Sequence, residues 1–277
     1  MTLGDLSESI APEHQKALQI ARTYLERPDF AARLAEYAGR PVEHIFRVMP
    51  RVANARLNKA VETTILSCLK LAIGSLRERP RRRPASRTSS VLAGINGGVS
   101  GFFGLAALPV ELPLTTTLML REIADIARHH GEDLSNLEAR LACIEVLGLG
   151  TRRPQGGLEV GYYASRAMLS KLVADASSHL IERGVTGVSA PAVSSLLAEI
   201  IRRFGLVASE RVAASALPVA GALGGATVNF LFMNHFQRVA HGHFTIRRLE
   251  RHYGREIVRG YYQSLSGNPS EKKITRL

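Results

Sequence analysis

The chain has 277 residues, of which 45% are hydrophobic and 22% charged. This composition excludes a disordered protein, and the two cysteines, Cys68 and Cys143, lie too far apart for a zinc ribbon, a CxxC redox site or a disulfide-rich secreted scaffold. Lys and Arg total 36 against 24 Asp and Glu, and the resulting net charge of +12 favours polyanionic partners such as anionic lipid or nucleic acid.

Apolar residues recur at helical spacing along most of the chain, and no sustained alternation predicts a sheet. We therefore expect an all-α protein, a bundle of roughly ten helices. Val61, Ile65 and Leu69 form the stripe of a long helix over about 52–77. Six arginines and two prolines within 77–88 predict an exposed basic linker, which ends an N-terminal helical region, 1–88.

Two glycine-rich apolar segments follow, at 91–110 and 212–234. Both contain the sequence Ala-Leu-Pro-Val, which suggests two pseudo-repeated halves. Glycines four apart on a helix form a flat strip against which another helix packs closely, in lipid or in a protein core. The residues expected to provide this packing are Gly97, Gly101, Gly221 and Gly225.

Several local signals divide the rest of the chain. One helix is expected to end at Gly131, and the capping box at 135–138 predicts another that runs to about Gly148. Later helices are expected at about 158–183 and 191–205, with Ser209 capping the next one. Residues 266–277 are expected to form a polar tail.

Arginine clusters stand next to both apolar segments. Each Arg near an anionic membrane surface contributes about 1 kcal/mol, so we expect these clusters to contact lipid headgroups; the alternative is a solvated face with local ion pairs. The arginines predicted to make this contact are Arg81, Arg82, Arg83, Arg247 and Arg251. The N-terminal residues do not resemble a secretory signal, and we expect a cytoplasmic protein at the inner face of the cell membrane.

Glu111 is the one formal charge between Thr88 and Leu120. A carboxylate in an apolar setting needs a partner or a raised pKa. It could be a buried acid that shares a pocket with Asn229 and His235, or it could face water at a proline-bounded turn. The sequence contains no HExxH, Walker A or GxSxG motif, and its histidine spacing predicts no metal site; we expect no cofactor.

The segments 101–134, 137–150 and 204–254 resemble the EcsC protein family, with Gly161-Tyr162-Tyr163-Ala164-Ser165-Arg166 between them. This resemblance suggests that 89–265 is an EcsC-like helical domain. It implies a bacterial, membrane-associated helical protein and implies no particular reaction. Some members of the family carry a peptidase label. That label is the only support from the family for the hydrolase alternative described below.

Together these observations favour a non-enzymatic protein that docks on anionic lipid or on a membrane protein. The first alternative is a membrane-proximal hydrolase or peptidase that uses Glu111 as its acid or base. The second is a helical nucleic-acid-binding protein, which we rank last because it leaves the apolar segments without a role outside the core. The chain could also form a homo-oligomer.

Overall fold

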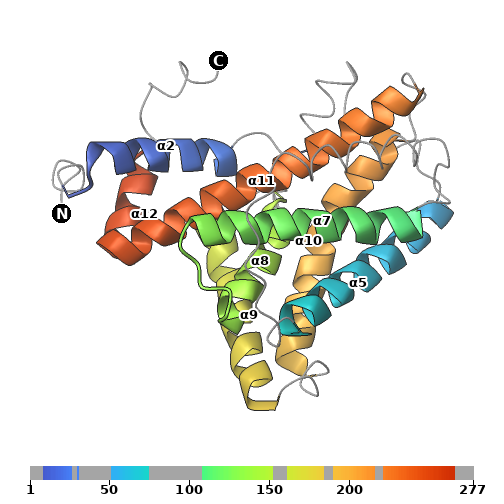
Figure 1. Ribbon diagram of the computed structural model, residues 1–277, viewed down its shortest axis with the longest axis horizontal. Helices are drawn as coiled ribbons and strands as arrows, with labels where there is room; N and C mark the ends of the chain where they lie inside the picture. The colour runs from blue at the N-terminus through green and yellow to red at the C-terminus, as the bar shows by residue number, and fades with distance from the viewer. Residues whose placement is uncertain are drawn as a thin grey trace.

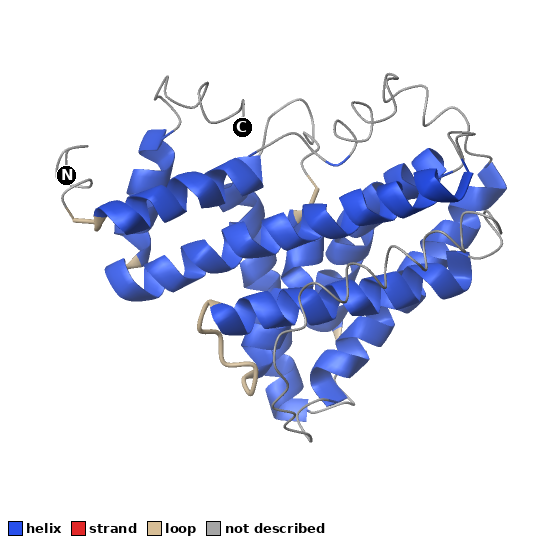
Figure 2. Cartoon of the chain, turned by 45° about the horizontal axis from the view of Figure 1, so that its top comes forward, coloured by secondary structure: helices blue, strands red, loops and turns tan. Residues whose placement is uncertain are grey.

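The computed structural model describes residues 9–26, 30, 51–74, 108–151, 161–183, 190–215 and 221–265. This part of the chain is helical and contains no strand, which confirms the all-α class (Figure 2). It forms eight helices, fewer than the roughly ten expected: α2 (Pro12–Glu26), α5 (Arg51–Gly74), α7 (Leu108–His129), α8 (Leu137–Leu149), α9 (Tyr162–Arg183), α10 (Pro191–Ser215), α11 (Gly221–Tyr253) and α12 (Arg255–Ser264). The pseudo-repeated halves stay a prediction.

Helix α8 lies at the centre of the fold. Its sequence, LEARLACIEVLGL, is apolar on all sides, and a helix of this kind is stable in water only when other elements surround it. Helices α5, α7, α9, α10 and α11 all contact it, and nearly all of its side chains are buried. Cys143 of α8 and Cys68 of α5 are buried free thiols.

Helix α11 is the longest element, with 33 residues and a length of about 50 Å at 1.5 Å per residue. It crosses the molecule diagonally, with α2 and α12 at its C-terminal end (Figure 1). In the middle of the core, Phe232 and Phe236 of α11 meet Phe204 of α10, with ring centroids 5.2–6.0 Å apart. These rings join the two long helices.

Two glycines outside the predicted strips allow close packing against α11. A Cβ atom on Gly242 would lie 2.7 Å from Leu25 Cγ and 3.0 Å from Ala21 O, so this glycine lets α2 approach the middle of α11. A Cβ on Gly150 would lie 2.4 Å from the Phe236 ring. The predicted strips are not tested: Gly97 and Gly101 lie outside the described residues, and of Gly221 and Gly225 the structure gives only their place in the first turns of α11.

Some predicted boundaries are wrong. Helix α10 passes through Gly205 without a break, and Ser209 caps no helix, because its hydroxyl donates to Gly205 O at 2.7 Å. The N-cap of α8 is Asn136, one residue later than Ser135, with its side chain accepting from Glu138 N at 2.9 Å. The predicted end at Gly131 is confirmed, since α7 stops at His129 and Gly131 has φ +79°.

The two apolar segments do not form two long apolar helices in the described part of the chain. Residues 91–107 lie outside it, whereas 212–215 end α10 and 221–234 begin α11. Among the described helices, none combines the length and the mean hydropathy that crossing a bilayer requires. The predicted domain boundary at 88/89 and the tail 266–277 also lie outside the described residues.

Candidate functional site

Glu111 lies in the first turn of α7 and forms an ion pair with Arg211 of α10. Pro113 lies inside α7, so of the two alternatives for Glu111 the water-facing turn is wrong. Arg211 is buried, and its guanidinium lies 5.1 Å from the centroid of the Phe232 ring of α11. Glu111 therefore links the first turn of α7 to the C-terminal part of α10, beside Phe232 of α11.

The other two residues of the predicted Glu111 pocket both lie on α11. Asn229 and His235 are buried. His235 Nε2 donates to the carbonyl oxygen of Gly150 at 2.7 Å, so it satisfies the C-terminal end of α8. The contact of His235 has a structural role, and Glu111 pairs with a cation that the sequence did not single out.

A buried polar cluster joins α9 to α11. Arg166 donates two hydrogen bonds to Glu250, at 2.7 and 2.6 Å, and Tyr163 donates a third at 3.3 Å. Next to this pair, Tyr162 Oη lies 3.0 Å from His243 Nδ1. Both members of the Arg166–Glu250 pair are about one-tenth exposed, so breaking either one leaves a charge in the core.

Glu145 of α8 lies in the same region and is fully buried. Ser170 of α9 donates to one of its oxygens at 3.1 Å, and burial raises the pKa of this carboxyl to about 7. Burial also lowers the pKa of His243 well below its usual range, so this imidazole is neutral. By its spacing, Glu138 lies on the same face of α8 as Glu145. Glu138 is exposed at the start of the helix, however, so it forms no buried carboxylate pair with Glu145.

The predicted headgroup arginines on α11 have a different partner. Arg247 donates to both oxygens of Glu132, at 2.9 and 3.1 Å. Arg251 also binds Glu132 and donates to His130 O at 2.7 Å. Both guanidinium groups therefore fix the turn that follows α7, and Arg251 remains nearly half exposed. Arg81, Arg82 and Arg83 lie outside the described residues.

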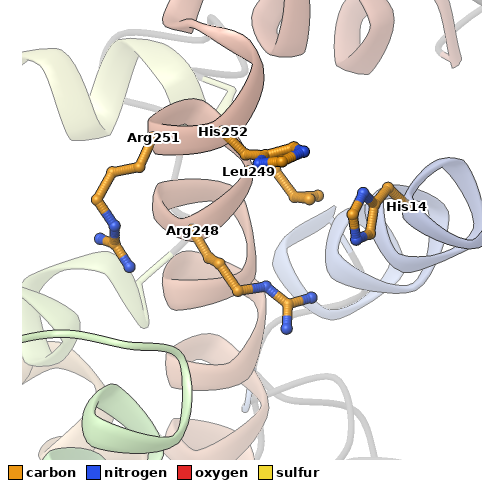
Figure 3. Close-up of a pocket in the computed structure, with 5 residues that line it drawn as sticks. All are labelled: His14, Arg248, Leu249, Arg251 and His252. Carbon is orange, nitrogen blue, oxygen red and sulfur yellow. The ribbon is translucent and has the colours of Figure 1, made fainter. Parts of the chain in front are cut away.

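A basic pocket lies where α2 crosses the C-terminal part of α11, and its volume is about 370 Å³ (Figure 3). None of the described residues that line it is acidic; they are His14, Arg248, Leu249, Arg251 and His252. The sequence interpretation missed this pocket, because it considered arginines spaced four residues apart and did not include Arg248. Arg248 has no ion-pair partner among the described residues, and its Nε is buried without a hydrogen bond.

The histidines of α11 contact different elements. His241 Nδ1 lies 3.4 Å from His130 Nε2, at the end of α7, whereas His243 meets Tyr162 of α9. This agrees with the expectation that residues two apart on a helix cannot share one ion. Within the described ranges, no group of three or more His, Cys, Asp or Glu side chains could hold a metal ion.

A family model described as the EcsC protein family matches residues 13–249. The chain belongs to the EcsC protein family. Neither the curated proteins nor the solved structures contain a match. The EcsC match begins in the first turn of α2 and ends near the C-terminus of α11, so it includes His14, Arg248 and Leu249 and stops before Arg251 and His252. It therefore covers most of the basic pocket and every helix of the core except α12.

Proposed function

We propose that this EcsC protein is a non-enzymatic, peripheral membrane protein that docks on anionic lipid headgroups at the cytoplasmic face of the cell membrane. The observation that carries the proposal is the basic pocket between α2 and α11, with an arginine that no carboxylate of the described chain neutralises. A partly exposed cation of this kind attracts anionic headgroups within a Debye length of the surface.

The charges around the pocket support the same surface. Four exposed cations lie at the end of the molecule built by α2, the last turns of α11 and α12 (Figure 1), together with the exposed carboxylates Glu13 and Glu256; the cations are Lys16, Arg251, Arg255 and Arg259. Two of the acidic residues at this end have internal partners. Glu250 binds Arg166, and Glu26 accepts from Tyr262 Oη at 3.0 Å. These carboxylates offset less of the outward positive charge than their number suggests.

The contacts of Glu111 favour this function over the hydrolase alternative. A general acid or base must reach a substrate, whereas the Glu111 carboxylate is bound by the buried Arg211. The ion pair has an evident structural role, because it connects α7 and α10.

Vesicle binding tests the proposed surface. The purified chain is expected to sediment with vesicles that contain phosphatidylglycerol and not with pure phosphatidylcholine. Reversing Arg255 and Arg259 together to Glu should weaken this binding by at least roughly 30-fold, since each Arg contributes about 1 kcal/mol and the new carboxylates are repelled. Both side chains are exposed on α12, so the fold should be unaffected.

The matched control reverses Lys59 and Lys70 of α5 to Glu. Both are exposed and lie away from the α2–α11–α12 end, while the change in net charge is the same. An equal loss of binding in the two double variants would show that net charge alone, and not this surface, attracts the membrane.

A further inference from the structure

We propose that the α2–α11 pocket is a binding site for a phosphate group, with Arg248 as the principal ligand and His14 as a second donor. The inference rests on the proposed function insofar as a lipid headgroup is the source of the phosphate. A free phosphate or phosphate monoester offers the same chemistry, and the experiment below separates the two sources.

Arg248 is an arginine of α11 with no carboxylate partner among the described residues. Its neighbours Arg247 and Arg251 are bound by Glu132. Its side chain extends from α11 toward α2, and Arg251 points away from His14 (Figure 3). A guanidinium has five N–H donors in a planar fork that matches two oxygens of a phosphate.

His14 is oriented by the end of α11. Tyr253 Oη accepts a hydrogen bond from Ala11 N at 3.2 Å and lies 2.7 Å from His14 Nδ1. Donation of the tyrosine proton to Nδ1 satisfies both groups, and it places the proton of the neutral imidazole on Nε2. The ring therefore has an N–H donor on the edge that Tyr253 does not occupy. The ring of His252 lies 5.8 Å away, centroid to centroid, and adds a second imidazole.

The electrostatic potential of the pocket also favours an anion. The first turn of α2 lies here, so the positive end of its dipole adds to the arginine charge, and the exposed Glu13 of the same turn offsets part of it. Burial, followed by the charges of His241 and Arg248, lowers the pKa of the nearby His130 to about 4. Glu132, in the turn after α7, is already bound by two arginines.

The size of the pocket suits a headgroup. Its volume of about 370 Å³ lies at the lower end of the range for small-molecule sites, which is about 300–1,000 Å³. Leu249 supplies an apolar wall beside the cations. A phosphate with a small organic substituent would fit here without any rearrangement of α2.

The test uses the full chain and compares Arg248→Gln and Arg248→Lys with Arg255→Gln, which removes one exposed charge outside the pocket. Isothermal titration calorimetry with inorganic phosphate should show binding to the wild type. We expect Arg248→Gln to weaken it by roughly tenfold or more, the cost of a hydrogen bond to a charged group. Arg248→Lys should recover part of the loss, and Arg255→Gln should change little.

The same proteins are then tested with vesicles of phosphatidylglycerol in phosphatidylcholine. If the lipid is the source, Arg248→Gln should weaken vesicle binding more than Arg255→Gln does. If the wild type binds inorganic phosphate but not vesicles, the pocket is a site for free phosphate, and the proposed membrane docking is overturned. Vesicle binding that Arg248→Gln and Arg255→Gln weaken equally, with no binding of inorganic phosphate, would overturn the pocket site and leave docking intact.

Discussion

Replacing Arg166 with methionine is expected to lower the free energy of unfolding by roughly 3–5 kcal/mol. The substitution leaves the Glu250 carboxylate buried between α9 and α11 without its cation and without two of its three hydrogen bonds. Methionine keeps much of the side-chain volume, so the loss reports the missing charge and not a cavity. Urea denaturation followed by circular dichroism measures this difference.

Two further variants isolate the cause. Arg128→Met removes an exposed arginine that pairs with Asp125 on the same helix, and such a pair contributes less than about 1 kcal/mol. The double variant Arg166→Met/Glu250→Leu removes both buried charges and should recover much of the lost stability. A single Arg166→Met variant as stable as Arg128→Met would contradict the role given to this pair.

Substituting Glu111 with glutamine is expected to lower the free energy of unfolding by roughly 3 kcal/mol. Arg211 is buried, and glutamine offers it a hydrogen bond without the compensating negative charge. The loss should appear at neutral pH in chemical denaturation. The control is Glu138→Gln, an exposed carboxylate in the first turn of α8, for which we expect less than about 1 kcal/mol.

The same variant separates a structural carboxylate from a catalytic one. If Glu111 binds only Arg211, the destabilised protein should still bind anionic vesicles at a temperature where it remains folded. An unchanged stability would mean that the ion pair contributes little, and it would return Glu111 to the position of a candidate acid or base.

Local patterns predicted the helices well where one stripe determined burial. Val61, Ile65 and Leu69 are all buried in α5, and the glycine at 131 marks the end of α7. The prediction failed at Gly205, where a helical glycine costs only about 1 kcal/mol and the buried neighbours Phe204 and Val207 outweigh it. The local cost of a helical glycine therefore predicted the wrong helix end at Gly205, where tertiary packing determines that the helix continues.

The candidate site was harder to predict, because its important pairs are distant in sequence. Glu111 and Arg211 are 100 residues apart, and Arg247 lies 115 residues from Glu132. Arg247 and Arg251 both lie on α11, but their spacing could not show that they meet the turn after α7. Arg248, which lies about 100° around the helix from Arg247, lines the pocket.

Fractionation of bacterial cells that produce the tagged full chain tests the central claim of membrane docking most directly. The protein should be found with the membranes at low salt and be released by about 1 M salt, where the Debye length falls to about 3 Å. Retention through both high salt and alkaline carbonate would show that apolar segments enter the bilayer and would contradict peripheral docking. A protein found entirely in the soluble fraction at low salt would contradict membrane association itself.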